Sequence, residues 1–289
     1  MAPSAFLLGA AMIRASLSND FPPRSTPGAD HDHEAPLMLS IFRRRSRASP
    51  PSPPADMMPG VGPGDFWKIG ETTVELVSEW AGLRRSDRVL DVGCGMGRIA
   101  WPLSHHLGRR GRYVGFDVVL KYVAWCQEQL GLDKQRFFFC YYPLRSSMYS
   151  EAGEIAPEHF EFPWEAGLFT LAIATSLFTH LLPEATEHYL QQMRRVLKPG
   201  GRVFASFFLV DEGSKAVVEA GTTYPSFNER LDWGWLNNAA VPEDGVAFNK
   251  DWLLPLFEKS GLRVKSVHPG SWRGPTAPYY QDVIVATAV

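Results

Sequence analysis

Residues 88–98 read RVLDVGCGMGR, and this stretch decides the fold. Arg88–Val92 is a short apolar run typical of a buried strand, and three alternating glycines follow it at once. Glycine permits a sharp turn and a close approach between backbone and ligand. The helical pattern of Gly97–Leu107 then places free N–H groups at the same turn. The stretch therefore predicts a strand, a ligand-binding turn and a helix.

Strands and helices alternate along the chain from about residue 60. Apolar strands are expected at 88–92, 112–117, 136–140, 168–174, 202–208, 262–267 and 282–288. The clearest helix between them begins at Pro183 and ends at the turn Lys198–Gly201. This alternation implies an α/β fold, with one doubly wound domain over 60–289 and a mostly parallel sheet of these seven strands.

Two segments, 141–167 and 209–249, are longer than ordinary loops. Each follows the carboxyl end of a strand, which is the edge where open α/β sheets bind ligands. We therefore expect these insertions to form a cap over a substrate pocket. Aromatic residues gather in them and in the C-terminal loop, and they suit a ring, a sugar face or a lipid-like acceptor, although most can equally form small cores beneath the loops. They are Tyr141, Tyr142, Tyr149, Trp164, Tyr224, Phe227, Trp233, Trp235, Trp272, Tyr279 and Tyr280.

The first 59 residues differ in composition from the rest. They hold 10 of the 23 prolines, and residues 43–54 run RRRSRASPPSPP. Such a segment buries too little apolar surface to become ordered, so we expect a disordered tail over 1–59. The alternatives are a signal peptide around 5–13, a basic patch at 43–47, and a later start at Met38 or Met57.

Charge and cysteine content narrow the class of protein. The chain has 29 Lys+Arg against 31 Asp+Glu, a net charge of −2, which gives no overall attraction to nucleic acid or anionic lipid. No apolar run approaches the roughly 18 residues of a membrane span. Cys94, Cys126 and Cys140 are widely spaced, which suits a reducing compartment and offers no metal-binding pair. We expect a cytoplasmic protein without a metal site.

Two acids distinguish the ligands that such a turn can bind. Asp117 ends the second strand, 20 residues after Gly97, where a carboxylate can accept both ribose hydroxyls of an adenosine ligand. Nicotinamide-dependent oxidoreductases share that feature. Here, however, the spacing is G-x-G-x-G rather than G-x-G-x-x-G, and Asp91 stands two residues before the first glycine. An acid there repels a pyrophosphate but attracts the ammonium and sulfonium of S-adenosylmethionine (SAM).

Four stretches, in order, resemble the motifs of class I SAM-dependent methyltransferases. They are VLDVGCGMGRIA (89–100), YVGFDV (113–118), the strand 168–174 with the TSLFTHL that follows it, and RVLKPGGRVF (195–204). The resemblance covers about residues 60–289. It implies the Rossmann-like fold of that family, with an antiparallel C-terminal strand, SAM as the cofactor and methyl transfer as the reaction.

The resemblance also implies which residues bind the cofactor. Asp91 and the glycines would wrap the methionine and ribose, Asp117 would bind the ribose hydroxyls and Val118 would pack on the adenine. Thr175 and Ser176 would face the reacting methyl group. The family's usual acid after the third strand is missing from Cys140–Pro143, so the adenine must be read in another way. The full implied set is Asp91, Gly93, Cys94, Gly95, Gly97, Asp117, Val118, Thr175 and Ser176.

His180 is the candidate general base, because it lies just beyond the fourth strand and imidazole titrates near neutrality. The alternative is that His180 caps or packs against the next helix. Asp211 and Glu212, just past the fifth strand, are the second candidates.

The end of the fourth strand lacks the motifs of amino and cytosine-C5 methylation, and it lacks the acids of a magnesium site. We therefore expect methyl transfer from SAM to a small molecule, at oxygen. A SAM-binding sensor or scaffold without catalysis is the alternative, and a nicotinamide-dependent oxidoreductase is a further one.

Overall fold

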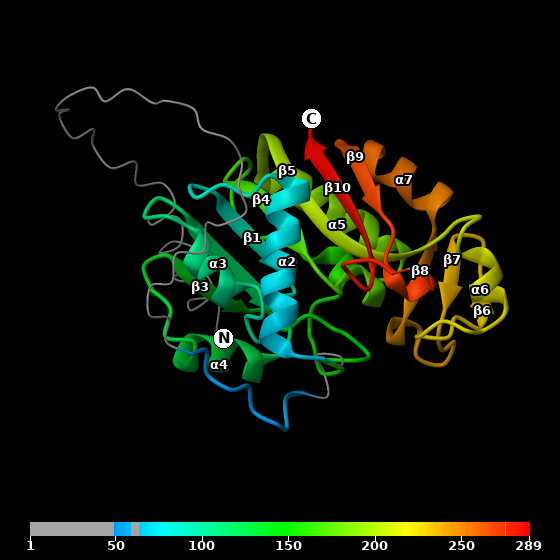
Figure 1. Ribbon diagram of the computed structural model, residues 1–289, viewed down its shortest axis with the longest axis horizontal. Coiled ribbons are helices and arrows are strands. Elements are labelled where there is room, and N and C mark those ends of the chain that lie inside the picture. The colour runs from blue at the N-terminus through cyan, green and yellow to red at the C-terminus, as the bar shows by residue number, and fades with distance from the viewer. Residues whose placement is uncertain (1–48, 59–63, 275) are drawn as a thin grey trace.

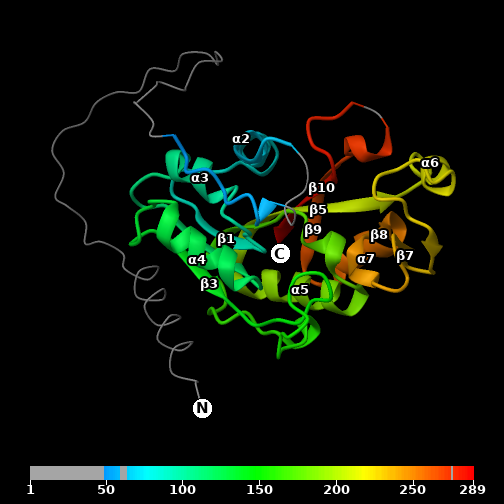
Figure 2. The same ribbon diagram turned by 90° about the horizontal axis from the view of Figure 1, so that it is seen from below.

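The computed structural model describes residues 49–58, 64–274 and 276–289. A twisted sheet runs through its centre, and helices lie on both faces of this sheet (Figures 1 and 2). The α/β class predicted from the sequence is confirmed, since the order of elements alternates between strand and helix from β1 to β5.

Five parallel strands form the part of the sheet that carries the glycine turn. In sheet order they are β3 (Phe137–Tyr141), β2 (Arg112–Asp117), β1 (Arg88–Val92), β4 (Phe169–Ala174) and β5 (Leu197–Val210). β10 (Asp282–Ala288) runs antiparallel between β5 and β9 (Leu262–His268), which is the expected antiparallel C-terminal strand. The strand order reverses between β1 and β4, so ligands are expected at the carboxyl ends of these two strands.

The segment 209–249 adds three strands to the seven expected. β5 is 14 residues long, and its last three residues pair in parallel with β8 (Val246–Asn249). β7 (Gly234–Leu236) and β6 (Glu229–Arg230) continue this part of the sheet in antiparallel order. The short helix α6 (Lys215–Glu219) precedes them. These strands have two to four residues, too few to show a hydrophobic period.

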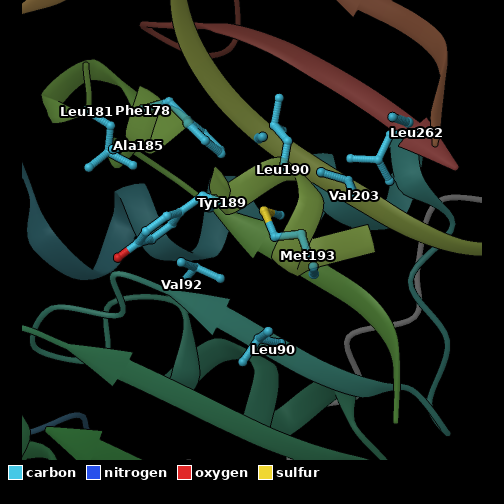
Figure 3. Packing of buried hydrophobic residues seen from close by; sticks show 14 of the residues in the cluster. Leu90, Val92, Phe178, Leu181, Ala185, Tyr189, Leu190, Met193, Val203 and Leu262 are labelled. Carbon is cyan, nitrogen blue, oxygen red and sulfur yellow. The ribbon is translucent and has the colours of Figure 1, made fainter. Parts of the chain in front are cut away.

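The helices divide between two hydrophobic layers. One face of the sheet is covered by α2 (Phe66–Ala81), α3 (Ala100–His106) and α4 (Leu120–Gln129). The other is covered by α5 (Pro183–Val196) and α7 (Lys250–Lys259). Figure 3 shows Tyr189 and Met193 of α5 on the side of Val92 and Leu90 of β1, and Leu190 on the side of Val203 of β5. Met193 is fully buried, so truncation to Ala costs about 2–5 kcal/mol of stability.

Aromatic side chains from the insertion 141–167 complete the face that α5 covers. Phe160, Phe162 and Trp164 contact the ring of Phe116 on β2, with centroids 5.2–5.7 Å apart. Tyr142 joins the same cluster. Of the aromatic residues expected around the pocket, Tyr142 and Trp164 therefore belong to the main core.

Residues 49–58, expected in the disordered tail, lie against the helical face formed by α2 and α4. The indole N–H of Trp67 donates to the carbonyl of Pro51 (3.2 Å), and Met57 and Met58 pack on the buried cluster. The rest of the expected tail, residues 1–48 and 59, lies outside the described residues. Within the described ranges, no helix has the length and apolar character needed to cross a bilayer.

Candidate functional site

The glycine turn lies between β1 and α3 at the carboxyl edge of the sheet. Gly93, Gly95 and Gly97 have φ of +76°, +52° and +71°, a region that other residues rarely adopt. A Cβ on Gly97 would lie 2.5 Å from Leu130 Cδ1, and one on Gly93 would lie 3.2 Å from Leu177 Cδ1. A Cβ on Gly95 would meet nothing within 4 Å. Two glycines therefore pack the turn against its neighbours, and Gly95 borders open space.

Asp117 ends β2 beside this turn. Its Oδ2 accepts a hydrogen bond from the N–H of Gly95 (2.7 Å), and its Oδ1 accepts one from the N–H of Val119 (2.9 Å). Burial raises the pKa of Asp117, and the backbone hydrogen bonds act in the opposite direction. Each carboxylate oxygen keeps a further lone pair. Asp117 thus ties the turn to β2 and can still accept from two hydroxyls.

Asp91 lies beneath the turn and is only 1% exposed. Its Oδ2 accepts from the hydroxyl of Tyr113 (2.6 Å), whereas its Oδ1 is buried without a hydrogen-bond partner. Burial raises the pKa of Asp91 to about 7; the Tyr113 bond opposes this, and the charge of Asp117 adds to it. An unsatisfied buried acceptor costs about 1–3 kcal/mol, which a donor or cation from outside the chain can offset.

An adenosine ligand that carries a positive charge fits this turn. It would meet the open space at Gly95, the lone pairs of Asp117 and the unpartnered oxygen of Asp91. Ribose offers two hydroxyl donors, and an ammonium group offers the missing charge. SAM has both, so the residues present are compatible with the cofactor implied by the sequence.

The turn after β4 lies at the same edge and carries Thr175 and Ser176. Ser176 has φ of +53° and is the one residue other than glycine with a positive φ in the described part of the chain. Its N–H donates to the hydroxyl of Ser206 (2.8 Å) and its hydroxyl donates to Gln281 (3.1 Å). Leu177 lies against Gly93. The fold therefore brings the residues expected near the methyl group beside the glycine turn.

His180 lies in the short helix η3 (Phe178–His180) that follows this turn. Its Nδ1 is 2.8 Å from the carbonyl oxygen of Glu243, which can only accept, so Nδ1 carries the proton and Nε2 presents a lone pair. The hydroxyl of Tyr149 is 3.4 Å from Nε2. Burial lowers the pKa of His180, while the Glu243 bond and nearby carboxylates act against this. A neutral imidazole of fixed tautomer can accept a proton.

Glu243 joins the two insertions around His180. Its Oε2 accepts from the hydroxyls of Ser146 (3.0 Å) and Ser147 (2.9 Å) and from the N–H of Ser147 (2.6 Å). Burial, then the charges of Tyr122, Asp117 and Asp244, raise the pKa of Tyr149 to about 12. Glu243 was not among the residues expected at the site, and Tyr149 was only one of many aromatics. The length of the insertions was the only signal for either.

One residue of the expected set, Cys94, lies differently. The side chain of Cys94 is buried beneath the turn against Gly115, so it faces the core rather than the open space. Burial raises the pKa of the Cys94 thiol, which is unsuited to nucleophilic chemistry. Val118 is half-buried: it packs against the main hydrophobic core and keeps part of its surface exposed.

Asp211 and Glu212, the second candidates for the base, line a separate polar cavity of about 780 Å³. Asp211 pairs with Arg273 (2.9 Å) and Lys250 (3.5 Å). Burial opposes the effect of these cations, but together they lower the pKa of Asp211. No residue of the glycine turn lines this cavity, so neither acid is brought to the predicted site.

Comparison with known proteins supports the same assignment. Residues 89–201 match a family model described as a methyltransferase domain. Curated relatives include a 2-phytyl-1,4-naphtoquinone methyltransferase of Synechocystis sp., 25% identical over 170 residues, which cover 58% of this chain and 62% of the relative. A chloroplastic 2-phytyl-1,4-beta-naphthoquinone methyltransferase of Arabidopsis thaliana is 23% identical over 141 residues, 48% of this chain and 49% of the relative. The chain thus spans about half to three fifths of the length of these relatives.

A solved structure with a similar fold is magnesium protoporphyrin IX methyltransferase from Synechocystis with bound S-adenosylhomocysteine (SAH). It superposes with a TM-score of 0.53 at 14% identity, covering 81% of this chain and 94% of that chain. At this identity the likeness shows a shared fold.

Proposed function

The chain contains a domain of the class I SAM-dependent methyltransferase family, and from this premise we propose that it transfers a methyl group from SAM to a small-molecule acceptor. When bound, SAM supplies a methyl group already activated by its sulfonium. The observation that carries the proposal is the meeting of Asp91, Gly95 and Asp117 at one open turn on the carboxyl edge of the sheet.

In this proposal Asp117 accepts from the ribose hydroxyls and Asp91 balances the ammonium group. The backbone of the glycine turn faces the cofactor and Val118 borders the adenine. Thr175 and Ser176 lie beside the methyl group. In-line transfer needs alignment and exclusion of water more than it needs a reactive protein group. The two insertions, joined at Glu243, form the cap that excludes water from the acceptor.

For the acceptor we propose a ring hydroxyl, with His180 as the base. Its Nε2 lone pair can take the hydroxyl proton, and the bond from Nδ1 to Glu243 fixes the tautomer. Tyr149 lies on the same side and orients the acceptor oxygen. The names of the two curated relatives favour an aromatic acceptor of the quinone or quinol type.

The test is methyl transfer from SAM labelled with carbon-13 in its methyl group. The purified chain is incubated with a panel of hydroxylated naphthalenes and simple phenols, and the products are read by carbon NMR. A methoxy signal with stoichiometric SAH is the expected result. An aryl-methyl signal would move the acceptor atom to carbon, and SAM binding without turnover on any acceptor would favour the sensor alternative.

A further inference from the structure

Tyr279 brings a hydroxyl to the cofactor end of the site from outside all four sequence motifs. It lies in the loop between β9 and β10. Its hydroxyl interacts with the hydroxyls of Thr73 on α2 and Thr175 after β4, and the charges of Arg98 and Asp91 act on it. These four residues come from four different elements around the glycine turn, so the Tyr279 hydroxyl lies where those elements meet.

The backbone around Tyr279 is held in place by its own loop. The N–H of Ser271 donates to the carbonyl of Tyr279 (3.0 Å), and the N–H of Trp272 donates to the carbonyl of Tyr280 (3.0 Å). At the foot of the loop, the fully buried Asp282 accepts from the indole N–H of Trp272 (2.7 Å). A side chain held in this way contacts a ligand at a lower cost in ordering entropy.

The same loop is bonded to the turn after β4. Oε1 of Gln281 accepts from the hydroxyls of Ser206 (2.6 Å) and Ser176 (3.1 Å). Ser206 in turn accepts from the N–H of Ser176 (2.8 Å). The loop that carries Tyr279 and the turn that carries Thr175 therefore form one connected unit.

Tyr279 supplies a neutral oxygen at this position. Burial raises the pKa of Tyr279, and its interactions with Thr73, Arg98 and Thr175 offset only part of that effect. The phenol is therefore no base near neutral pH. It offers lone pairs and a dipole, which favour an adjacent positive charge.

We propose that Tyr279 positions the methyl donor, with its hydroxyl oxygen in contact with the sulfonium end of bound SAM. This inference rests on the proposed function, in which Asp91 lies at the ammonium group and Thr175 at the methyl group. The sulfonium joins those two parts of the cofactor. Tyr279 packs against the buried cluster that contains Cys94 and Met96 of the glycine turn, and Gln281 bonds its loop to Ser176 beside Thr175. Tyr279 therefore lies between these two parts of the site.

The test compares SAM with SAH, since SAH lacks the methyl group and the positive charge. Affinities of both are measured by titration calorimetry for the full chain, for Tyr279→Phe and for Tyr280→Phe. Tyr280 is the matched control because it is adjacent, 44% exposed, and its hydroxyl bonds instead to the carbonyl of Tyr224. We expect Tyr279→Phe to weaken SAM binding about tenfold and SAH binding less than about twofold. Tyr280→Phe should change neither.

An equal loss of SAM and SAH affinity in Tyr279→Phe would indicate a merely structural role and overturn the inference, as would no loss at all. If the unaltered chain binds neither ligand, the proposed function itself fails. Should Tyr279→Phe melt at a much lower temperature, 3-fluorotyrosine placed at position 279 gives a second reading. Its fluorine resonance should shift more with SAM than with SAH, and equal or absent shifts would contradict the contact.

Discussion

The two sides of the ligand edge are assembled in different ways. On the proposed cofactor side, Asp91, Gly95 and Asp117 come from one continuous strand–turn–helix–strand unit, and backbone N–H groups donate to Asp117. On the acceptor side, His180 meets Tyr149 and Glu243 across 31 and 63 residues of chain. Local backbone geometry specifies the first side, and side-chain contacts between distant segments specify the second. We therefore predict that cofactor and acceptor recognition can be disrupted separately.

The largest expected effect is on the acceptor side. His180→Gln should lower turnover by about 10²–10⁴-fold, the usual contribution of a general base, and leave SAM affinity unchanged. At saturating SAM, the lowered pKa of His180 keeps the base neutral near neutral pH, so turnover should decline only at a pH below the usual titration range of histidine. Steady-state rates across pH, with SAM calorimetry beside them, check both points. Full turnover in His180→Gln would remove His180 as the base.

Asp117→Ala should break the cofactor side. Charge-assisted hydrogen bonds to two ribose hydroxyls are lost, so SAM affinity should fall by about 100-fold or more. Asp133→Ala is the control, because Asp133 is an exposed acid. Among the described residues, its one ion pair is with Arg136. Calorimetry with SAH gives the same comparison without turnover. An unchanged affinity in Asp117→Ala would refute the ribose assignment.

The raised pKa of Asp91 predicts a pH dependence of cofactor binding. The ammonium group of SAM is attracted only by the ionised carboxylate of Asp91, whose pKa is about 7. SAM affinity should therefore fall about tenfold per pH unit below 7. Asp91→Asn should bind SAM weakly at every pH, without this slope. In the free protein, a rise in pH toward 7 has the opposite effect: it lowers the stability of the folded state. The folded state holds a proton that the unfolded chain has released above about pH 3.8, so this contribution to stability is lost as pH rises toward 7.

The smallest expected effect lies at the junction between the insertions. Glu243→Gln replaces a charged acceptor of three hydrogen bonds by a neutral one, which should raise the acceptor KM about fivefold and leave SAM affinity unchanged. Glu187→Gln loses an ion pair with the 68% exposed Lys259 and keeps an oxygen that can accept from the side chain of Gln191, so it should change neither. A parallel loss of SAM affinity in Glu243→Gln would show that the two sides are not separable.

The same contrast explains how much the sequence could predict. The seven main strands, the glycine turn, Asp117 and the turn after β4 follow from hydrophobic period and glycine chemistry, because each is specified within a few residues. β6 to β8 are too short to show a period. The insertion 141–167 covers the sheet with aromatic side chains, and no helical spacing in the sequence predicts this packing.

The partners of His180 and the place of Tyr279 could not be predicted for a related reason. Glu243 acts partly through its backbone carbonyl, which every residue has. Tyr279 reaches Thr73 on α2, an element some two hundred residues earlier in the chain, through a loop of irregular backbone. Contacts of this kind depend on the assembled fold rather than on any local pattern.

Hydrogen–deuterium exchange of the full chain with and without SAM tests whether the glycine turn is the cofactor site. We predict slower exchange on SAM binding in peptides covering residues 93–98, 117–119 and 175–177, where backbone N–H groups border the proposed cofactor site. Unchanged exchange at the glycine turn, or protection confined to peptides around the cavity of Asp211 and Lys250, would contradict it.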